Sequence, residues 1–153
     1  MEEHAAATVP ASFRDLLERP LIAHLATIRD DGSVQSNPMW FRWDGRRIRM
    51  THTRTRQRFR NVSAEPRVSL SIVDPDDPQR YLEVRGVVEA IEDDSDARFY
   101  QKLREHYGST GGRIRDADVR VVLVIRPTVV LARSPGRGDA PASIERSMAP
   151  AQG

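Results

Sequence analysis

The chain contains 153 residues, of which 39% are hydrophobic and 30% are charged, and its formal net charge is +2. This size fits a single domain with a proper core, and the absence of cysteine excludes disulfides, thiolate metal sites and cysteine nucleophiles. No run of about 18 apolar residues is present, and the acidic start MEEH does not match a secretory signal, so we expect a cytoplasmic protein without membrane spans.

The first half of the chain predicts a short helix and two successive β-hairpins. A capping-box pattern favours a helix over residues 12–19. An Asp-Asp-Gly turn and an Asp-Gly turn separate three predicted strands, over residues 21–29, 33–43 and 47–53. In the second strand Pro38 removes a backbone donor, which indicates a bulge, a sheet edge or a ligand contact. In the third strand Ile48, Met50 and His52 share one face.

The second half of the chain predicts two helices and three longer strands. Thr55 is placed to cap a helix over residues 55–64, and acidic residues begin a second helix over residues 94–107. Strands are expected over residues 67–74, 81–91 and 119–131. We expect a bulge at Gly86 and an interruption of the last strand at residues 126–127.

These elements indicate a mainly β (α+β) protein. The strands are not regularly separated by helices, which argues against a doubly wound parallel sheet. We expect a small six-stranded antiparallel barrel with peripheral helices, because closure of a barrel removes edge strands. The barrel domain is expected over residues 1–133. Residues 134–153, rich in Pro, Gly, Ala and Ser, are expected to form a disordered tail.

A short polar segment after the third strand suggests an anion site. Residues 51–61 carry four arginines: Arg54, Arg56, Arg58 and Arg60. Their guanidinium groups repel one another and suit phosphate or carboxylate oxygens. Residues 42–67 hold nine basic and two acidic residues, whereas residues 74–96 hold nine acidic and two basic ones. The basic stretch therefore predicts an anion site beside a helix start, and the acidic stretch either lies on another surface or pairs with these arginines.

Side chains for other kinds of chemistry are not evident. The four histidines are scattered without ligand spacing, so no metal site is expected. The chain also lacks a nucleophile elbow, a phosphate loop and an acid–base pair, so we assign no catalytic side chain. A redox enzyme that borrows a cofactor can work in this way, because its protein mainly binds and orients the reactive ring.

Four segments occur in an order typical of one superfamily: residues 25–32, 36–41, 53–68 and 82–86. Together they resemble the split-barrel flavin-binding superfamily typified by the pyridoxamine-phosphate oxidases, and more closely its branch that uses the deazaflavin coenzyme F420. The resemblance covers roughly residues 13–132. It implies a homodimer of six-stranded barrels, with a cofactor in each of two grooves between subunits.

The resemblance also implies a cofactor site and an activity. Arg56, Gln57 and Arg58 would hold the cofactor phosphate. The other implied residues lie along the ring, the polyol or the phosphate: Ser36, Asn37, Pro38, Met39, Trp40, Thr51 and Thr53. The implied activity is hydride transfer from reduced F420 to a small organic acceptor.

The alternative cofactor is FMN, in an FMN-binding oxidoreductase. F420 is preferred because its long anionic tail requires an extended basic track, which Arg46, Arg47 and Arg49 would lengthen. Classical pyridoxamine-phosphate oxidases end in a short Arg-containing motif that this chain lacks, so vitamin B6 synthesis is not expected. A nucleic-acid-binding barrel is the third alternative. Such surfaces interleave aromatic residues with basic ones, and the arginine run contains only Phe59, so nucleic acid is not the expected partner.

Overall fold

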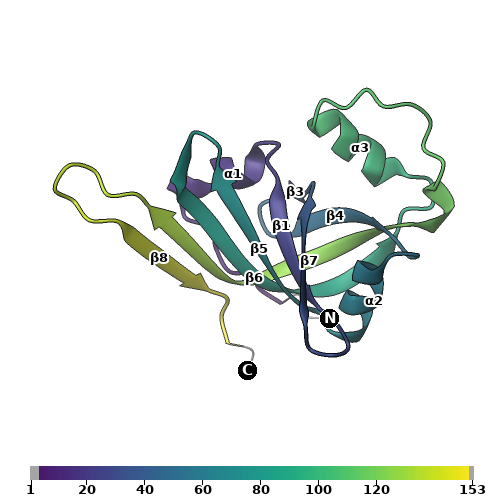
Figure 1. The fold of residues 1–153 in the computed structure, drawn as a ribbon, viewed down its shortest axis with the longest axis horizontal. Coiled ribbons are helices and arrows are strands. Elements are labelled where there is room, and N and C mark those ends of the chain that lie inside the picture. Colours follow the sequence, from purple (N-terminus) through teal and green to yellow (C-terminus); the bar gives the residue numbers. More distant parts are fainter. Residues whose placement is uncertain (1–3, 152–153) are drawn as a thin grey trace.

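The computed structural model describes residues 4–151, which form one antiparallel sheet with helices around it (Figure 1). The strands are β1 (Ala23–Ile28), β2 (Val34–Met39), β3 (Arg42–Trp43), β4 (Ile48–Thr53), β5 (Arg67–Asp74), β6 (Asp77–Asp93), β7 (Arg120–Ser134) and β8 (Ser143–Met148). The helices are η1 (Ala11–Phe13), α1 (Asp15–Glu18), α2 (Gln57–Ala64), α3 (Arg98–His106) and η2 (Ala117–Val119), where η denotes a 3-10 turn. Within residues 4–151, no helix has the length and apolar character needed to cross a membrane. The predicted mainly β architecture with peripheral helices is confirmed.

The order of the strands explains why the sheet curls. Neighbours in the sheet follow the order β2-β1-β5-β6-β7-β4-β3, and β8 pairs with β7 outside this path. The strands at the two ends of the order, β2 and β3, are separated in the chain only by Trp40 and Phe41. The sheet must therefore bend round until its ends lie close together, which gives it the form of a barrel.

The prediction of a closed, six-stranded barrel is wrong, because the sheet has eight strands and is not closed. The strand expected over residues 33–43 breaks at Trp40 and Phe41. At this break the Tyr107 hydroxyl accepts a hydrogen bond from the Phe41 amide at 3.0 Å and donates to the Leu21 carbonyl oxygen at 2.6 Å. A side chain thus satisfies backbone groups that a neighbouring strand would satisfy in a closed barrel.

The core fills the inside of the curled sheet. On β5 the residues Val68, Leu70 and Ile72 are buried and alternate with Ser69 and Ser71, as the sequence predicts. Burial of one such Leu or Ile side chain contributes roughly 1.5–3 kcal/mol to folding. The alternation therefore fixes which face of each strand points inward.

Gly86 allows β6 and β7 to cross closely. The register of the pair shifts between Arg85 and Gly86, so the predicted bulge is present. A Cβ atom at Gly86 would lie 2.5 Å from the backbone oxygen of Arg126. Pro127 pairs with Gly86 at this point, so the expected interruption of the last strand is a bulge within a continuous β7.

The C-terminal segment, which the sequence analysis expects to be disordered, contains strand β8. The reason lies in the length of β7. Residues 120–125 of β7 pair with β4, whereas residues 129–134 extend past the end of β4 and pair with β8. The edge of β7 that β4 leaves open is thus covered, and Figure 1 shows the resulting hairpin projecting from the sheet.

The N-terminal caps predicted for the first two helices are not formed in the structure. The first helix is only η1 followed by the single turn α1, and no side chain caps either of them. Helix α2 begins at Gln57 and has the extended residue Arg56 as its N-cap, while the Thr55 hydroxyl lies 3.3 Å from the Thr53 hydroxyl instead. The arginines at 54 and 56 therefore lie in a turn between β4 and α2 rather than in a helix.

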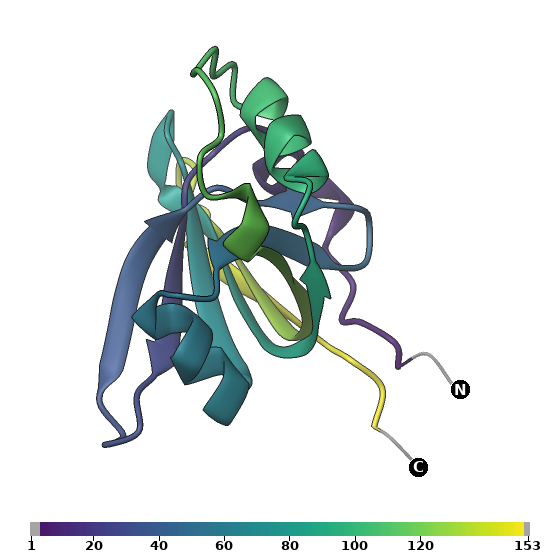
Figure 2. The ribbon, with the colours of Figure 1, turned by 90° about the vertical axis from the view of Figure 1, so that its right-hand side faces the viewer.

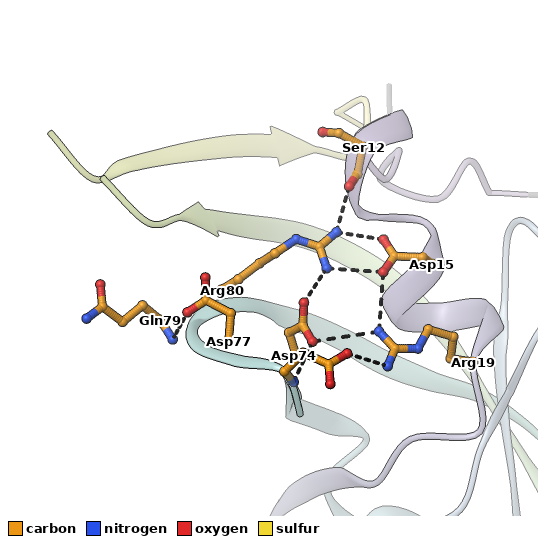
Figure 3. A network of polar contacts seen from close by, with 8 residues as sticks. Ser12, Asp15, Arg19, Asp74, Asp77, Gln79 and Arg80 are labelled. Atoms are coloured by element: carbon orange, nitrogen blue, oxygen red, sulfur yellow. Dashed lines mark hydrogen bonds and ion pairs between the residues drawn. The ribbon is translucent and has the colours of Figure 1, made fainter. Parts of the chain in front are cut away.

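A network of ion pairs holds α1 against the turn between β5 and β6 (Figure 3). The Arg80 guanidinium donates to Asp15 at 2.6 Å, to Asp74 at 2.8 Å and to the Ser12 carbonyl oxygen at 2.7 Å. The hydrogen bond from Arg80 lowers the pKa of the Asp15 carboxyl group below its usual range. Arg19 pairs with the same aspartates. This network serves the packing of the N-terminal segment and lies apart from the arginines of residues 51–61.

Candidate functional site

A cavity of about 320 Å³ lies where the end of β4 meets the start of α2 and the first turn of α3. Its lining comes from β2 with the residue after it, from β4, from the N-terminus of α2, from α3 and from the start of β7: Pro38, Met39, Trp40, Thr51, His52, Thr53, Arg56, Arg58, Tyr100 and Arg120. We refer to it as the arginine cavity. In Figure 2, α3 lies above and α2 below the short η2 segment, so the two helices approach the sheet from different ends.

The arginine cavity gathers most of the residues that the family resemblance implies. Those that line it are Pro38, Met39, Trp40, Thr51, Thr53, Arg56 and Arg58. Pro38 lies on β2, which within residues 4–151 pairs only with β1 and is therefore a sheet edge. A sheet edge is one of the three settings expected for Pro38 from the sequence. The three implied residues outside its lining are Ser36, Asn37 and Gln57.

The amides of Gln57 and Asn37 belong to an internal network. The Gln57 amide donates to the Asn61 side chain at 2.9 Å, and Asn61 in turn donates to Thr27 at 3.0 Å and to Gln35 at 3.2 Å. Gln35 donates to the Asn37 oxygen at 2.9 Å. This chain of bonds ties α2 to the β1–β2 hairpin, and thereby fixes where the N-terminus of α2 points. Ser36 lies exposed on the opposite side of β2 from Asn37.

Two guanidinium groups face the cavity without a carboxylate to neutralise them. The residues lining the cavity in the described part of the chain include no Asp or Glu. Burial and the nearby positive charge of Arg56 both lower the pKa of Arg58. The Arg58 Nε atom donates to the Nε2 atom of His52 at 3.4 Å. Like charges held together in this way favour binding of an anion between them.

Three other arginines of the basic stretch have acidic partners. Arg47 pairs with Glu89, Arg49 with Asp44, and Arg54 with Asp93 at 3.3 Å. Part of the acidic stretch thus pairs with the basic stretch within the chain, which was one of the two predicted outcomes. A track extended by Arg47 and Arg49 is not supported, because these charges are already compensated.

Three residues that line the cavity were not predicted from the sequence: His52, Tyr100 and Arg120. His52 is buried, and burial first, then the charges of Arg58, Arg56 and Arg120, lower its pKa from 6.5 to about 4. It is thus neutral at pH 7, with Nε2 as the hydrogen-bond acceptor and the proton on Nδ1. The sequence did hold a signal that His52 belongs to the site, because its strand ends beside the arginine run. The strand pattern by itself indicated only that His52 shares a face with Ile48 and Met50.

The remaining two missed residues are Tyr100 and Arg120. The Arg120 guanidinium lies 3.7 Å from the centre of the Tyr100 ring and donates to the Thr51 hydroxyl at 3.1 Å. The pairing of Thr53 with Arg120 across β4 and β7 brings these distant segments together. No local motif marks either residue, so the sequence alone gave no signal for them.

The cavity has one apolar wall. The half-buried Trp40 ring stacks on Tyr107, with 4.7 Å between ring centres and 7° between planes. Met39 is buried beside it. Phe59, the aromatic residue inside the arginine run, packs against the hydrophobic core and is not available to stack on bases.

The lining therefore suits a planar ring joined to a phosphate. Trp40 and Met39 provide an apolar wall, Thr51 and Thr53 provide hydroxyl groups, and two uncompensated guanidinium groups lie at the end formed by the N-terminus of α2. Residues 4–151 contain no cluster of His, Cys, Asp and Glu that could hold a metal ion.

Comparisons with known proteins agree with this geometry. The family model described as pyridoxamine 5'-phosphate oxidase matches residues 9–134. A solved structure named F420 reductase shares 50% sequence identity, covers 80% of this chain and 98% of its own, and superposes with a TM-score of 0.78. No match was found among curated proteins.

Two more distant structures show the same fold. General stress protein 26 from Bacillus anthracis has 18% identity, covers 78% of this chain and 89% of its own, and gives a TM-score of 0.61. A conserved hypothetical protein from Mycobacterium tuberculosis has 24% identity, covers 85% of this chain and 87% of its own, and gives a TM-score of 0.65. From the family match and the split-barrel fold, we conclude that the chain belongs to the pyridoxamine 5'-phosphate oxidase family.

Proposed function

We propose that this protein is an oxidoreductase that binds coenzyme F420 in the arginine cavity and reduces a small organic acceptor. The observation that carries the proposal is the pair Arg56 and Arg58, which face a cavity with an apolar wall and without a lining carboxylate. The 50% identity to a protein named F420 reductase supports the choice of a deazaflavin. When bound, the reduced coenzyme would supply a hydride to an electron-poor carbon of the acceptor.

The roles proposed for this chain are binding and orientation. Arg56 and Arg58 would hold the phosphate through charge-assisted hydrogen bonds. Thr51 and Thr53 would donate to the polyol, and Trp40 would cover one face of the ring and exclude water from it. We assign no side chain to the hydride step itself. The proton that the reduced acceptor needs comes from solvent in this scheme.

A fluorescence titration of the purified protein with F420, and separately with FMN, tests the proposal. We expect F420 to bind more tightly than FMN, and Arg58→Ala to weaken F420 binding by about tenfold or more, because a hydrogen bond between charged groups contributes roughly 1.5–3 kcal/mol. Arg60→Ala is the matched control, since Arg60 lies exposed on the same helix outside the cavity. Equal affinity of wild type and Arg58→Ala would remove the phosphate assignment.

FMN is the alternative cofactor within the same family. A preference for FMN in the titration, together with yellow protein that releases FMN on denaturation, would assign the chain to that group. Either ring would meet the same apolar wall. The two cofactors differ in the anionic tail beyond the phosphate, which F420 has and FMN lacks.

A homodimer is the second part of the proposal. An apolar groove of about 430 Å³ crosses β1, β2, β5 and β6, and Val34 on its edge is 66% exposed. A groove of this kind is suited to a second copy of the chain. Light scattering should give the mass of a dimer for the wild type and of a monomer for Val34→Glu. Ile144→Glu, at a 63% exposed residue on β8 outside the groove, should leave the mass unchanged; a monomeric wild type would exclude the dimer.

A further inference from the structure

A second cavity lies beside the arginine cavity and has a strongly basic lining. Its volume is about 410 Å³, and it is lined by residues of α3, by the segment of residues 109–116 and by Arg120. Figure 2 shows the course of this segment from α3 to η2. The charged residues that line it are Arg104, Arg113, Arg115, Arg120 and Asp116. Four guanidinium groups thus surround a space that holds one carboxylate.

Arg120 and Tyr100 form the boundary between the two cavities, because they are the residues that line both. Arg120 donates to Thr51 on the side of the arginine cavity. On the other side its Nε and Nη2 atoms donate to the two carboxylate oxygens of Asp116 at 2.9 and 3.0 Å. A molecule in the second cavity is therefore one residue layer away from a ring bound in the first.

The lining includes a buried charge that the fold holds in place. Arg104 is only 6% exposed, and its Nη2 atom donates to the Gly112 carbonyl oxygen at 2.9 Å. A Cβ atom at Gly111 would lie 2.8 Å from the same Nη2 atom, so glycine lets the segment pass close over the guanidinium. Arg104 is thereby kept at the wall of the cavity although burial of a charge costs free energy.

Two further arginines are available for a ligand. Arg113 and Arg115 are exposed at the mouth of the cavity, and neither makes an ion pair within residues 4–151. Asp116 is already engaged through both oxygens by Arg120. An incoming carboxylate would therefore meet uncompensated positive charge from guanidinium groups, which can bind carboxylate oxygens through two parallel hydrogen bonds.

The position of this cavity indicates which molecule it serves. Neither Arg56 nor Arg58 lines it, so it lies on the far side of Arg120 from the residues proposed to hold the cofactor phosphate. The continuation of the arginine cavity on the phosphate side is a separate hollow lined by Gln35, Arg56, Gln57 and Arg58. A tail attached to the phosphate would leave through that hollow, whereas an acceptor has to approach the ring from another direction.

We propose that the second cavity binds a carboxylate group of the acceptor, and hence that the substrates of this protein are organic acids. The proposal rests on the proposed function, since it takes the arginine cavity as the cofactor site. The same chemistry is also present in the glutamate tail of F420, so the experiment must separate the two sources.

The test compares two probes of nearly the same shape, the anionic naphthalene-2-carboxylate and the neutral naphthalene-2-carboxamide, by calorimetric titration of the F420-loaded protein. We expect the carboxylate to bind about tenfold more tightly than the amide. In Arg113→Ala/Arg115→Ala this preference should disappear, because these exposed residues supply the free charges. Arg60→Ala/Arg98→Ala removes two exposed charges outside both cavities and should retain the preference.

The affinity for F420 is measured in the same variants, with F420 that carries glutamates and F420 that carries none. If the affinity for each form is the same in Arg113→Ala/Arg115→Ala as in the wild type, the second cavity is an acceptor site. A loss of affinity only for the form with glutamates would assign the cavity to the cofactor tail and overturn the proposal, as would equal binding of carboxylate and amide to the wild type.

Failure of the proposed function would be visible separately, because F420 would then not bind the wild type at all. In that case the two probes are titrated against the protein without cofactor. If the protein prefers the carboxylate and Arg113→Ala/Arg115→Ala abolishes this preference, the second cavity is still an anion site. If the wild type shows no preference for the carboxylate, the anion site is excluded.

Discussion

Tyr107 stacks face to face on Trp40, and its hydroxyl also bonds to the backbone of Phe41, just after β2, and of Leu21, just before β1. One side chain from the end of α3 thus fixes both the bend between β2 and β3 and the apolar wall of the arginine cavity. Burial raises the pKa of this hydroxyl to about 12, so it stays protonated and keeps its donor at any physiological pH.

Tyr107→Phe should therefore lower the free energy of unfolding by about 1–3 kcal/mol, because the Phe41 amide and the Leu21 carbonyl group lose a partner. Urea denaturation followed by circular dichroism measures the change. Tyr81→Phe is the control, since the Tyr81 hydroxyl makes no hydrogen bond within residues 4–151 and its loss should have an effect near zero. Equal stability of the Tyr107→Phe variant and the wild type would contradict the structural role given to Tyr107.

Gly86→Ala should destabilise the fold through a backbone clash. The added Cβ would lie 2.5 Å from the Arg126 backbone oxygen, which cannot move without disturbing the pairing of β6 with β7. We expect a loss of about 2 kcal/mol or more, in the range of overpacked cores. Gly112→Ala, where nothing lies within 4 Å of the added Cβ, should change the unfolding midpoint very little. Similar midpoints for both variants would mean that the crossing is not as close as described.

His52 should make the stability of the protein depend on pH between about 6.5 and 4. Its folded-state pKa is lowered to about 4, so between these values the unfolded chain binds a proton that the folded chain does not. The stabilisation is complete above pH 6.5 and is lost as the pH falls towards 4. The total loss is roughly 3 kcal/mol. The Asp carboxyl groups with lowered pKa values, such as Asp15, act only at lower pH.

Thermal or urea unfolding of His52→Gln across this range checks the sign and the size of the effect. The decline should be smaller in His52→Gln than in the wild type, and unchanged in His24→Gln, since His24 is exposed on β1. The pKa of His106 is also lowered, first by burial, so only the comparison between variants isolates His52. If the stability of His52→Gln falls with pH as much as that of the wild type, His52 is not the source of the pH dependence.

Removal of residues 143–153 should leave the cofactor site intact. The side chains of β8 are mostly exposed, and neither cavity at the proposed sites includes any of them. We expect the truncated chain to fold, to bind F420 with wild-type affinity and to lose little stability. It should also be more prone to aggregate, because the outer edge of β7 over residues 129–134 loses its partner. Loss of F420 binding on truncation would show that the domain extends beyond residue 133.

The sequence predicted the features that depend on local patterns. The alternation of Val68, Leu70 and Ile72 gave β5 with its bounds unchanged, and Asp-Gly turns located the hairpins. Gly86 indicated a bulge because glycine inside a strand permits close backbone approach. The arginine run indicated an anion site because like charges so close together need a counter-charge.

Features that depend on distant parts of the chain were missed. The break at Phe41 requires the Tyr107 hydroxyl, and β8 requires the free edge of β7, and neither partner is near in sequence. Arg120 joins the arginine cavity through its pairing with Thr53. Pairing between distant strands cannot be seen in a local sequence pattern. For this reason the sequence led us to expect a closed barrel and a disordered tail.

The most direct measurement of the central claim is a crystal structure of the protein with F420 bound. The phosphate should lie within hydrogen-bond distance of the Arg56 and Arg58 guanidinium groups, with the ring against Trp40 and Thr51. A complex in which the phosphate lies elsewhere, while Arg56 and Arg58 point into solvent, would contradict it.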